Sequence, residues 1–211
     1  MHALILANGE APPREFLAEL RRNADLFIAA DGAANCLPGM GLAPDVVLGD
    51  FDSLTPAVRE CLPEAVFLPM QDQESSDLDK AIAYAAEQGA KRITLTGATG
   101  GRLDHALTHI SLLLKYHPEL DVRLLDEQME VRVVGAQPVE FRGKRGDKLS
   151  LIVFAPAEGV VAEGVLYPLR HETLFPGSRG VSNMLVGDTA RVSVRSGAVI
   201  ACHLRADYGE R

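Results

Sequence analysis

Acidic side chains recur in the first half of the chain, and their spacing suits chemistry on a phosphate group. Asp50 and Asp52 are one residue apart, and Asp77 follows in a second polar segment. Two aspartates at that spacing project on the same side of an extended segment, so both can reach one hard cation. Mg²⁺ prefers carboxylate oxygens together with water and substrate phosphates. Phosphoryl or pyrophosphoryl transfer is therefore the first hypothesis.

Each acidic motif also has an ordinary structural explanation. Acidic pairs in loops are commonly solvated turn formers. Asp77 in the first turn of a helix is favoured by the helix dipole without any ligand. Three carboxylates brought together, however, repel one another unless a cation compensates them. If Asp50, Asp52 and Asp77 converge, they imply bound Mg²⁺ or Mn²⁺.

A glycine-rich segment, Gly97–Gly101, lies between an expected strand and an expected helix. Backbone N–H groups in such a loop can hold phosphate oxygens, although a flexible turn explains the glycines equally well. No Gly-Lys-Ser/Thr follows, so this is not a Walker loop. Arg102 favours the phosphate interpretation because a guanidinium grips phosphate bidentately. Asp104 is then placed to orient either Arg102 or a hydroxyl nucleophile.

Short apolar runs alternate with helix-like stretches, which is typical of a parallel sheet with crossover helices. The runs cover residues 3–7, 26–30, 46–48, 65–68, 92–96 and 121–125. Helices are expected from Pro12, from a Ser76 cap to about Gln88, and from about Leu103 to His117. The third helix is expected to turn Leu107, Ile110, Leu113 and Leu114 inward. The polar motifs follow the carboxyl ends of the strands, so we expect them to converge on one crevice.

After residue 128 the sequence pattern changes from apolar runs that alternate with helix-like stretches to short strand-like runs separated by turns. This change predicts two domains. Residues 1–128 are expected to form an α/β domain, with a Rossmann-like parallel sheet and helices on both faces. Residues 129–211 are expected to form an all-β sandwich or partial barrel. Its strands are expected near 130–134, 139–142, 148–154, 159–162, 190–194 and 199–203. Ser182 and Asn183 have a turn as their default interpretation.

Composition limits the partners. The chain has 211 residues, 47% of them hydrophobic, and a formal net charge of −8. A negative charge argues against nucleic acid and anionic membranes, which need a basic surface. Three scattered cysteines and no apolar run of membrane-spanning length predict a soluble, cytoplasmic protein with reduced thiols.

Taken together, the motifs resemble the thiamine pyrophosphokinase (thiamine diphosphokinase) family along almost the whole chain. The residues that carry the resemblance are Asp31-Gly32-Ala33-Ala34, Gly49-Asp50-Phe51-Asp52-Ser53, Asp72-Gln73 through Ser76-Asp77 with Lys80, Gly100-Gly101-Arg102-Leu103-Asp104-His105, Tyr167-Pro168-Leu169 and Val181-Ser182-Asn183. Two departures are Glu74, where the family often has Asp, and the absence of tryptophan, which some members place against thiamine.

The resemblance implies transfer of the terminal pyrophosphoryl group of ATP to the thiamine hydroxyl, giving AMP and thiamine diphosphate. It also implies a homodimer with active sites between subunits. Catalytic roles are implied for Asp50, Asp52, Asp77, Arg102 and Asp104, with Asp50, Asp52 and Asp77 binding Mg²⁺. Nucleotide contacts are implied for Asp31, Gln73, Ser76, Gly100, Gly101 and Arg102, and thiamine contacts for Ser182 and Asn183.

Three alternatives stay open from the sequence. The first is a pyrophosphokinase for another hydroxymethyl heterocycle, such as a pterin. The second is an Asp-x-Asp glycosyltransferase, which would consume a nucleotide sugar. The third is a non-catalytic nucleotide or thiamine sensor, which would not need so complete a set of polar residues. His105 and His109 have the spacing of a zinc pair, but no glutamate lies between them in the metalloprotease order, and helix packing or a surface role better explains His109.

Overall fold

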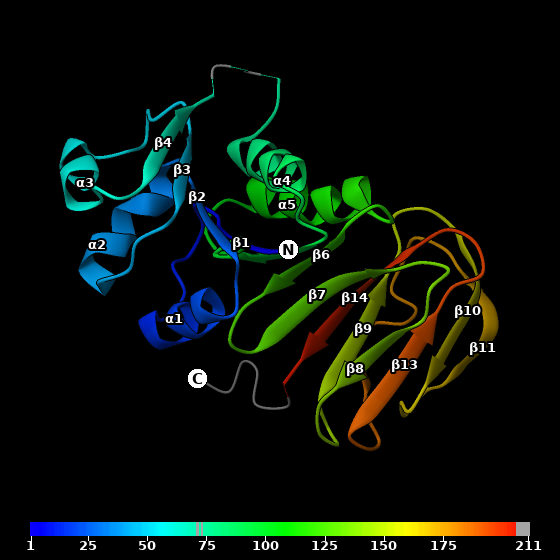
Figure 1. The fold of residues 1–211 in the computed structure, drawn as a ribbon. Helices are drawn as coiled ribbons and strands as arrows, with labels where there is room; N and C mark the ends of the chain where they lie inside the picture. The colour runs from blue at the N-terminus through cyan, green and yellow to red at the C-terminus, as the bar shows by residue number, and fades with distance from the viewer. Residues whose placement is uncertain (71, 73, 206–211) are drawn as a thin grey trace. The chain divides into compact units, whose positions relative to one another are not determined.

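The chain folds into two compact units, Met1–Glu127 and Gln128–Arg211, which we call the N-terminal and C-terminal units (Figure 1). The structure, a computed structural model, describes residues 1–70, 72 and 74–205. An α/β unit precedes an all-β unit, which confirms the predicted fold class. Among the described residues, no helix is long and apolar enough to cross a membrane.

Six parallel strands form the sheet of the N-terminal unit, in the order β6-β5-β1-β2-β3-β4. Each of the six apolar runs in the sequence became one of these strands. Their bounds are β1 His2–Leu6, β2 Leu26–Ala30, β3 Val46–Gly49, β4 Val66–Pro69, β5 Arg92–Thr96 and β6 Asp121–Leu125. Strand β1 is buried along its whole length because it lies inside the sheet and is covered on both faces.

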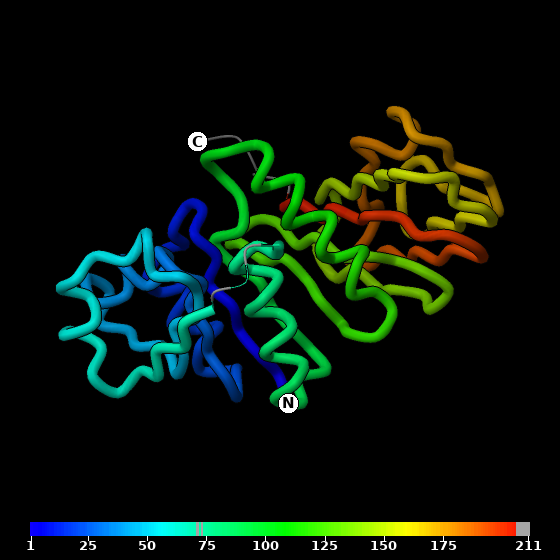
Figure 2. The backbone as a smooth tube through the Cα atoms, turned by 90° about the horizontal axis from the view of Figure 1, so that it is seen from above, coloured from blue at the N-terminus to red at the C-terminus, as the bar shows by residue number. Residues whose placement is uncertain are grey.

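Helices cover both faces of this sheet (Figures 1 and 2). On one face, Leu4 and Leu6 of β1 pack with Leu17 of α1 (Arg14–Arg22) and Leu37 of α2 (Leu37–Met40). The other face carries α4 (Asp77–Glu87), which packs on β1, β2 and β3, and α5 (Leu103–Tyr116) beside it. Helices α1, α4 and α5 lie where the sequence predicted helices.

Short helices and the inward face of α5 differ from expectation. The 3₁₀ helix η1 (Asp31–Cys36), α2 and α3 (Pro56–Cys61) were not predicted, because four to six residues are too few to show a helical period. In α5, Leu107 is 49% exposed, so its inward placement was wrong. Leu113 is buried as predicted, and Ile110 and Leu114 are half-buried. His109 and Leu112 are also buried, so a polar residue takes a core position there.

The C-terminal unit is a sandwich of two sheets, in the orders β12-β9-β14-β7 and β11-β10-β13-β8. The strands are β7 Met129–Val134, β8 Val139–Arg142, β9 Lys148–Ile152, β10 Ala157–Glu163, β11 Leu169–Leu174, β12 Asn183–Met184, β13 Thr189–Ser193 and β14 Val199–Leu204. One hydrophobic core joins both sheets, with Leu151 and Val199 from one and Phe141 and Val160 from the other. Strands β11 and β12 were not predicted.

The strand order places a topological switch point between β1 and β5. The chain leaves β1 toward β2 and leaves β5 toward β6, so the two following loops diverge at the carboxyl edge of the sheet. Backbone hydrogen bonds join these loops, from Gly9 N to Gly97 O at 2.8 Å and from Glu10 N to Thr99 O at 2.8 Å. Ligands of open α/β sheets bind at such an edge.

Candidate active site

A cavity of about 280 Å³ lies at this carboxyl edge, within the N-terminal unit. Its walls come from the segments that follow β1 to β4 and from the first turns of α5, so four of the predicted polar segments converge. Asp52 and residues 97–104, which were also expected at this crevice, are not among its lining residues. The polar side chains that line it are Asn8, Asp31, Asp50, Ser53, Ser75, Ser76, Asp77, Lys80, His105 and His109.

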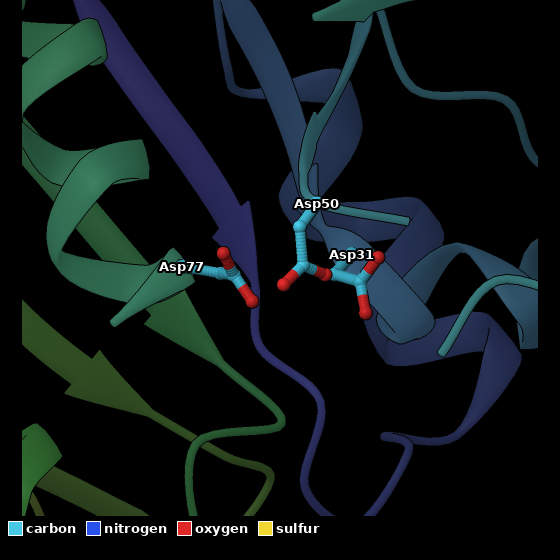
Figure 3. A group of neighbouring side chains, drawn as sticks. All are labelled: Asp31, Asp50 and Asp77. Atoms are coloured by element: carbon cyan, nitrogen blue, oxygen red, sulfur yellow. The ribbon is translucent and has the colours of Figure 1, made fainter. Parts of the chain in front are cut away.

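Three carboxylates meet in the cavity (Figure 3). Asp31 follows β2, Asp50 follows β3 and Asp77 begins α4, and one oxygen of each lies within 4.8 Å of the others. Around Mg²⁺, with bonds of about 2.1 Å to oxygen, ligand oxygens are separated by about 3–4 Å. The acidic group, Asp31, Asp50 and Asp77, therefore needs only small side-chain movements to hold one cation.

Local backbone geometry brings Asp31 into this group. Asp31 has φ of 42°, and its side chain is turned into the buried start of η1. A side chain at Gly49 would lie 2.7 Å from Asp31 Cβ, so the glycine lets the two segments approach. Asp31 Oδ1 is buried and makes no hydrogen bond to any described residue. A buried carboxylate oxygen without a donor suits a cation ligand.

Asp77 stands at the amino end of α4, where Ser76 caps the helix by accepting a hydrogen bond from Asp79 N at 3.3 Å. Burial raises the pKa of Asp77, and the charges of Asp31 and Asp50 add to this effect. Lys80 opposes it from 3.3 Å away, with a side chain only 9% exposed. Among the described residues that line the cavity, Lys80 is the one lysine or arginine, so the three carboxylates retain excess negative charge.

Asp52 is placed differently from Asp50. Phe51 has φ of 67°, so the segment is not extended as expected and the two carboxylates do not project together. Asp52 Oδ1 accepts a hydrogen bond from Ser53 Oγ at 2.8 Å, and Asp50 Oδ1 accepts one from Asp52 N at 3.1 Å. The group of three that the structure assembles contains Asp31 where the sequence analysis had Asp52.

The loop Gly97–Gly101 follows β5 and needs its glycines. Gly97, Gly100 and Gly101 have φ of 62°, 79° and 67°, which disfavour other residues. A side chain on Gly100 would also lie 2.7 Å from Glu10 Cβ. Among the described residues, no acceptor takes the backbone N–H groups of Ala98, Thr99 or Gly100. These amides remain available to an anion.

Arg102 and Asp104 form an exposed bidentate pair at the start of α5. Arg102 Nη2 donates to Asp104 Oδ2 at 2.6 Å and Nε donates to Oδ1 at 3.1 Å. This hydrogen bonding lowers the pKa of Asp104 to about 2. The paired carboxylate is therefore a weak proton acceptor, but it is well placed to orient the guanidinium.

The segment before α4 is partly described. Asp72 accepts hydrogen bonds from Glu74 N at 3.0 Å and from the Ser75 hydroxyl. Glu74 thus contacts Asp72 through its backbone. Gln73, a predicted nucleotide contact, lies outside the described residues.

Ser182 and Asn183 lie in the C-terminal unit, at the start of β12. Asn183 is buried, and its Oδ1 accepts from Tyr167 N and Met184 N, each at 2.9 Å. Its Nδ2 donates to Tyr167 O at 2.7 Å. Ser182 has φ of 60° and is exposed. Asn183 therefore fixes the backbone of Tyr167, and Ser182 is the more accessible of the pair.

Sequence reasoning gave Lys80 and His109 no role in the site, although both line the cavity. A signal for Lys80 existed, because a lysine three residues after Asp77 shares its helix face. For His109 only the 3.6-residue spacing from the leucines of α5 would have indicated burial.

An open parallel sheet with polar side chains at its carboxyl edge places the N-terminal unit among the ligand-binding α/β proteins. A family model described as the thiamin pyrophosphokinase catalytic domain matches residues 17–124. A second, described as the thiamin pyrophosphokinase vitamin B1 binding domain, matches residues 138–199. The chain therefore belongs to the thiamin pyrophosphokinase family.

Individual relatives are similar to this chain, in sequence or in structure, over nearly its full length. A thiamine pyrophosphokinase of Bacillus subtilis is 29% identical over 208 residues, covering 93% of this chain and 95% of the relative. A crystal structure of thiamine pyrophosphokinase from Bacillus subtilis superposes with a TM-score of 0.85 at 26% identity, covering 97% of this chain and 99% of the other. Yeast thiamin pyrophosphokinase shares the fold, with a TM-score of 0.79 at 15% identity and coverage of 98% and 87%.

Proposed function

We propose that this protein transfers the terminal pyrophosphoryl group of ATP to the hydroxyl of thiamine, giving AMP and thiamine diphosphate. Membership of the thiamin pyrophosphokinase family supports the reaction. The observation that carries the proposal is the acidic group in the cavity. The Gly97–Gly101 loop, which contacts the cavity residue His109 at Ala98 O, adds three amides that have no acceptor among the described residues.

The metal is proposed to be Mg²⁺ or Mn²⁺, held by Asp31, Asp50 and Asp77. Three carboxylate oxygens within 4.8 Å and the orphaned Asp31 Oδ1 suit a hard cation. When bound, the ion would offset the negative charge of the phosphate groups. A role for Asp52 as a further ligand, directly or through water, remains part of the proposal.

The phosphates of ATP are proposed to lie against the Gly97–Gly101 loop. The N–H groups of Ala98, Thr99 and Gly100 would donate to phosphate oxygens, and the exposed Arg102 would add a bidentate contact. Further contacts with the nucleotide are proposed for Ser76, Gly100, Gly101 and Gln73. These donors would stabilise the charge that develops as the pyrophosphoryl group moves.

In the reaction, the thiamine oxygen forms a bond to the β-phosphorus of ATP. The bond from that phosphorus to the oxygen that bridges it to the α-phosphate breaks, and AMP leaves. We assign the proton of the attacking hydroxyl to the carboxylate of Asp77, because this carboxylate lies in the cavity beside the proposed metal ligands Asp31 and Asp50. Asp104 is the poorer acceptor, since Arg102 lowers its pKa to about 2.

Thiamine is proposed to contact the C-terminal unit at Ser182 and Asn183. Ser182 offers an exposed hydroxyl, and Asn183 acts through the backbone of Tyr167, which it holds from both sides. With no tryptophan in the chain, the exposed ring of Tyr167 is an aromatic candidate nearby.

A homodimer with active sites between subunits and a cytoplasmic location are also proposed. Exposed apolar side chains of the C-terminal unit, among them Phe154, Tyr167 and Phe175, support a subunit contact. The free thiols of Cys36, Cys61 and Cys202 are consistent with a reducing compartment. Sedimentation of the active protein as a monomer would contradict the dimer.

The test is to incubate the purified protein with ATP, Mg²⁺ and thiamine, with an EDTA control, and to separate the products by chromatography. AMP and thiamine diphosphate in equal amounts are expected, and neither should form with EDTA. ADP with thiamine monophosphate would show a simple kinase instead. If no thiamine product forms, the same assay with a hydroxymethyl pterin, and then ligand binding alone, separates the pterin and sensor alternatives.

A further inference from the structure

Three consecutive carbonyl oxygens of the Gly97–Gly101 loop are anchored from outside the loop. Gly97 O accepts from Gly9 N and Thr99 O accepts from Glu10 N, each at 2.8 Å. Between them, Ala98 O lies 2.7 Å from His109 Nδ1. Two anchors are thus backbone groups of the segment after β1, and the third is a side chain of α5.

Anchoring a carbonyl fixes the direction of the next amide. In a planar trans peptide, the C=O of one residue and the N–H of the following residue point in opposite directions. The three anchors therefore set the directions of the Ala98, Thr99 and Gly100 N–H groups. These are the amides that have no acceptor among the described residues. His109 sets the direction of the middle one, Thr99 N–H.

The chemistry of this hydrogen bond also fixes the state of the imidazole. A carbonyl oxygen only accepts, so Nδ1 carries the proton and donates it. The ring is buried in α5, 8% exposed, and packs edge-on to His105 with centroids 6.1 Å apart. Burial lowers the pKa of His109, so the ring is neutral at physiological pH.

We propose that His109 is a positioning residue that holds the Gly97–Gly101 loop in its phosphate-binding conformation by donating Nδ1–H to Ala98 O. The inference rests on the proposed function, because it takes the phosphates of ATP as the ligand of this loop. It predicts that His109 acts on nucleotide affinity and not on thiamine affinity.

Two substitutions of His109 test the hydrogen bond from Nδ1 to Ala98 O, because one keeps a donor at that place and the other moves it. In His109→Asn, the side-chain amide nitrogen occupies about the place of Nδ1 and still donates to Ala98 O. In His109→Gln, the amide lies about where Nε2 was, so the bond to the loop is lost while a polar group remains in the cavity. His117→Gln is the matched control, since His117 ends the same helix and does not line the cavity.

We would measure the KM values for ATP and thiamine, the Kd for Mg·ATP without thiamine, and amide hydrogen exchange across residues 97–101. His109→Gln should raise the KM and Kd for ATP about tenfold, as expected for one lost hydrogen bond of about 1.4 kcal/mol. Its thiamine KM should change less than about twofold, and exchange in the loop should accelerate. His109→Asn and His117→Gln should stay near wild type in all three measurements.

Equal values for wild type and His109→Gln would overturn the inference, and so would equal losses in the Asn and Gln variants. If His109→Gln retains affinity for ATP and His109→Asn loses it, the ring nitrogen that matters is Nε2. The proposed role of the hydrogen bond from Nδ1 to Ala98 O would then be wrong as well. A wild-type protein that binds Mg·ATP but forms no thiamine diphosphate would defeat the proposed function alone. In that case nucleotide affinity and hydrogen exchange in the variants still decide the role of His109.

Discussion

The left-handed backbone at two residues determines which carboxylates share the cavity. Asp31 has φ of 42° and carries its side chain inward, whereas Phe51 has φ of 67° and separates Asp50 from Asp52. A residue other than glycine rarely adopts such angles without a local reason, and strained residues cluster at functional sites. Asp31 is therefore a candidate metal ligand on geometric grounds that its position in the sequence did not show.

Asp77 is the residue whose loss should matter most for turnover. Replacing it by Asn removes a proposed metal ligand and the proposed proton acceptor together, while the amide is isosteric and preserves helix α4. We expect kcat to fall by about 10²–10³-fold or more, since one strong transition-state contact alone is on that scale, with an unchanged circular dichroism spectrum. Near-normal turnover in this variant would remove Asp77 from the mechanism.

Asp31 and Asp52 make a matched pair for locating the cation. Asp31→Asn should raise the Mg²⁺ concentration for half-maximal activity by about tenfold or more, because a buried ligand oxygen loses its charge. Asp52→Asn should raise it by a smaller factor, because this side chain is exposed, is bound to Ser53 and would act as an outer ligand through water. Measuring the activity of both variants against Mg²⁺ concentration tests this expectation. A larger effect of Asp52→Asn than of Asp31→Asn would identify Asp52, and not Asp31, as the metal ligand.

Secondary-structure elements were predictable where burial is continuous. The apolar runs of β1 to β6 identified the parallel sheet, because strands covered on both faces contain few polar residues. The rule that ligands gather at the carboxyl ends of strands predicted that the polar segments after these strands converge, and Asp50 and Asp77 of the predicted acidic trio do so. What the sequence did not reveal depends on backbone angles and packing: the turn at Phe51, the burial of His109 instead of Leu107, and the short strands β11 and β12.

The carboxylate of Asp79 in α4 connects this helix to α5, because it binds two side chains of α5. Asp79 Oδ1 accepts from Tyr116 Oη at 2.6 Å, and Lys115 Nζ donates to Asp79 Oδ2 at 2.6 Å. Figure 2 shows the two helices side by side. The connection therefore joins the first turn of α4, which begins at Asp77, to the last turn of α5.

Tyr116→Phe should therefore lower the stability of the N-terminal unit. A hydrogen bond to a charged group contributes about 1.5–3 kcal/mol, so urea unfolding should show a loss in that range. Tyr84→Phe is the control, because Tyr84 lies on α4 and its hydroxyl bonds to no described residue. Equal stability losses in the two variants would mean that ring packing, not the bond to Asp79, is being measured.

At the scale of the whole molecule, acid sensitivity should concentrate in the N-terminal unit. Burial lowers the pKa of three histidines there, namely His2, His109 and His117. His2 is held neutral at the start of β1, with Nδ1 2.8 Å from Asn23 O and Nε2 2.9 Å from Thr94 Oγ1. Each ring must gain a proton as pH falls, and the folded state disfavours that protonated form.

The sign of the pH effect follows from linkage. The unfolded chain, with histidine pKa values near 6.5, binds more protons than the folded chain, so the free energy of unfolding rises with pH in this window. The contribution of the three histidines is fully present above about pH 7 and is lost as pH falls below 6.5 and through their lowered folded values. Urea midpoints should therefore decline between pH 7.5 and pH 5, before most carboxylates titrate.

His2→Gln tests which side chain carries this dependence. Glutamine can still bond to Thr94 but does not titrate, so the variant should show a smaller fall in urea midpoint between pH 7.5 and pH 5 than wild type. His171→Gln, which changes an exposed histidine of the C-terminal unit, should retain the wild-type fall. If both variants keep the full decline, buried His2 does not contribute to acid unfolding. If both lose part of it, the dependence is not confined to the N-terminal unit.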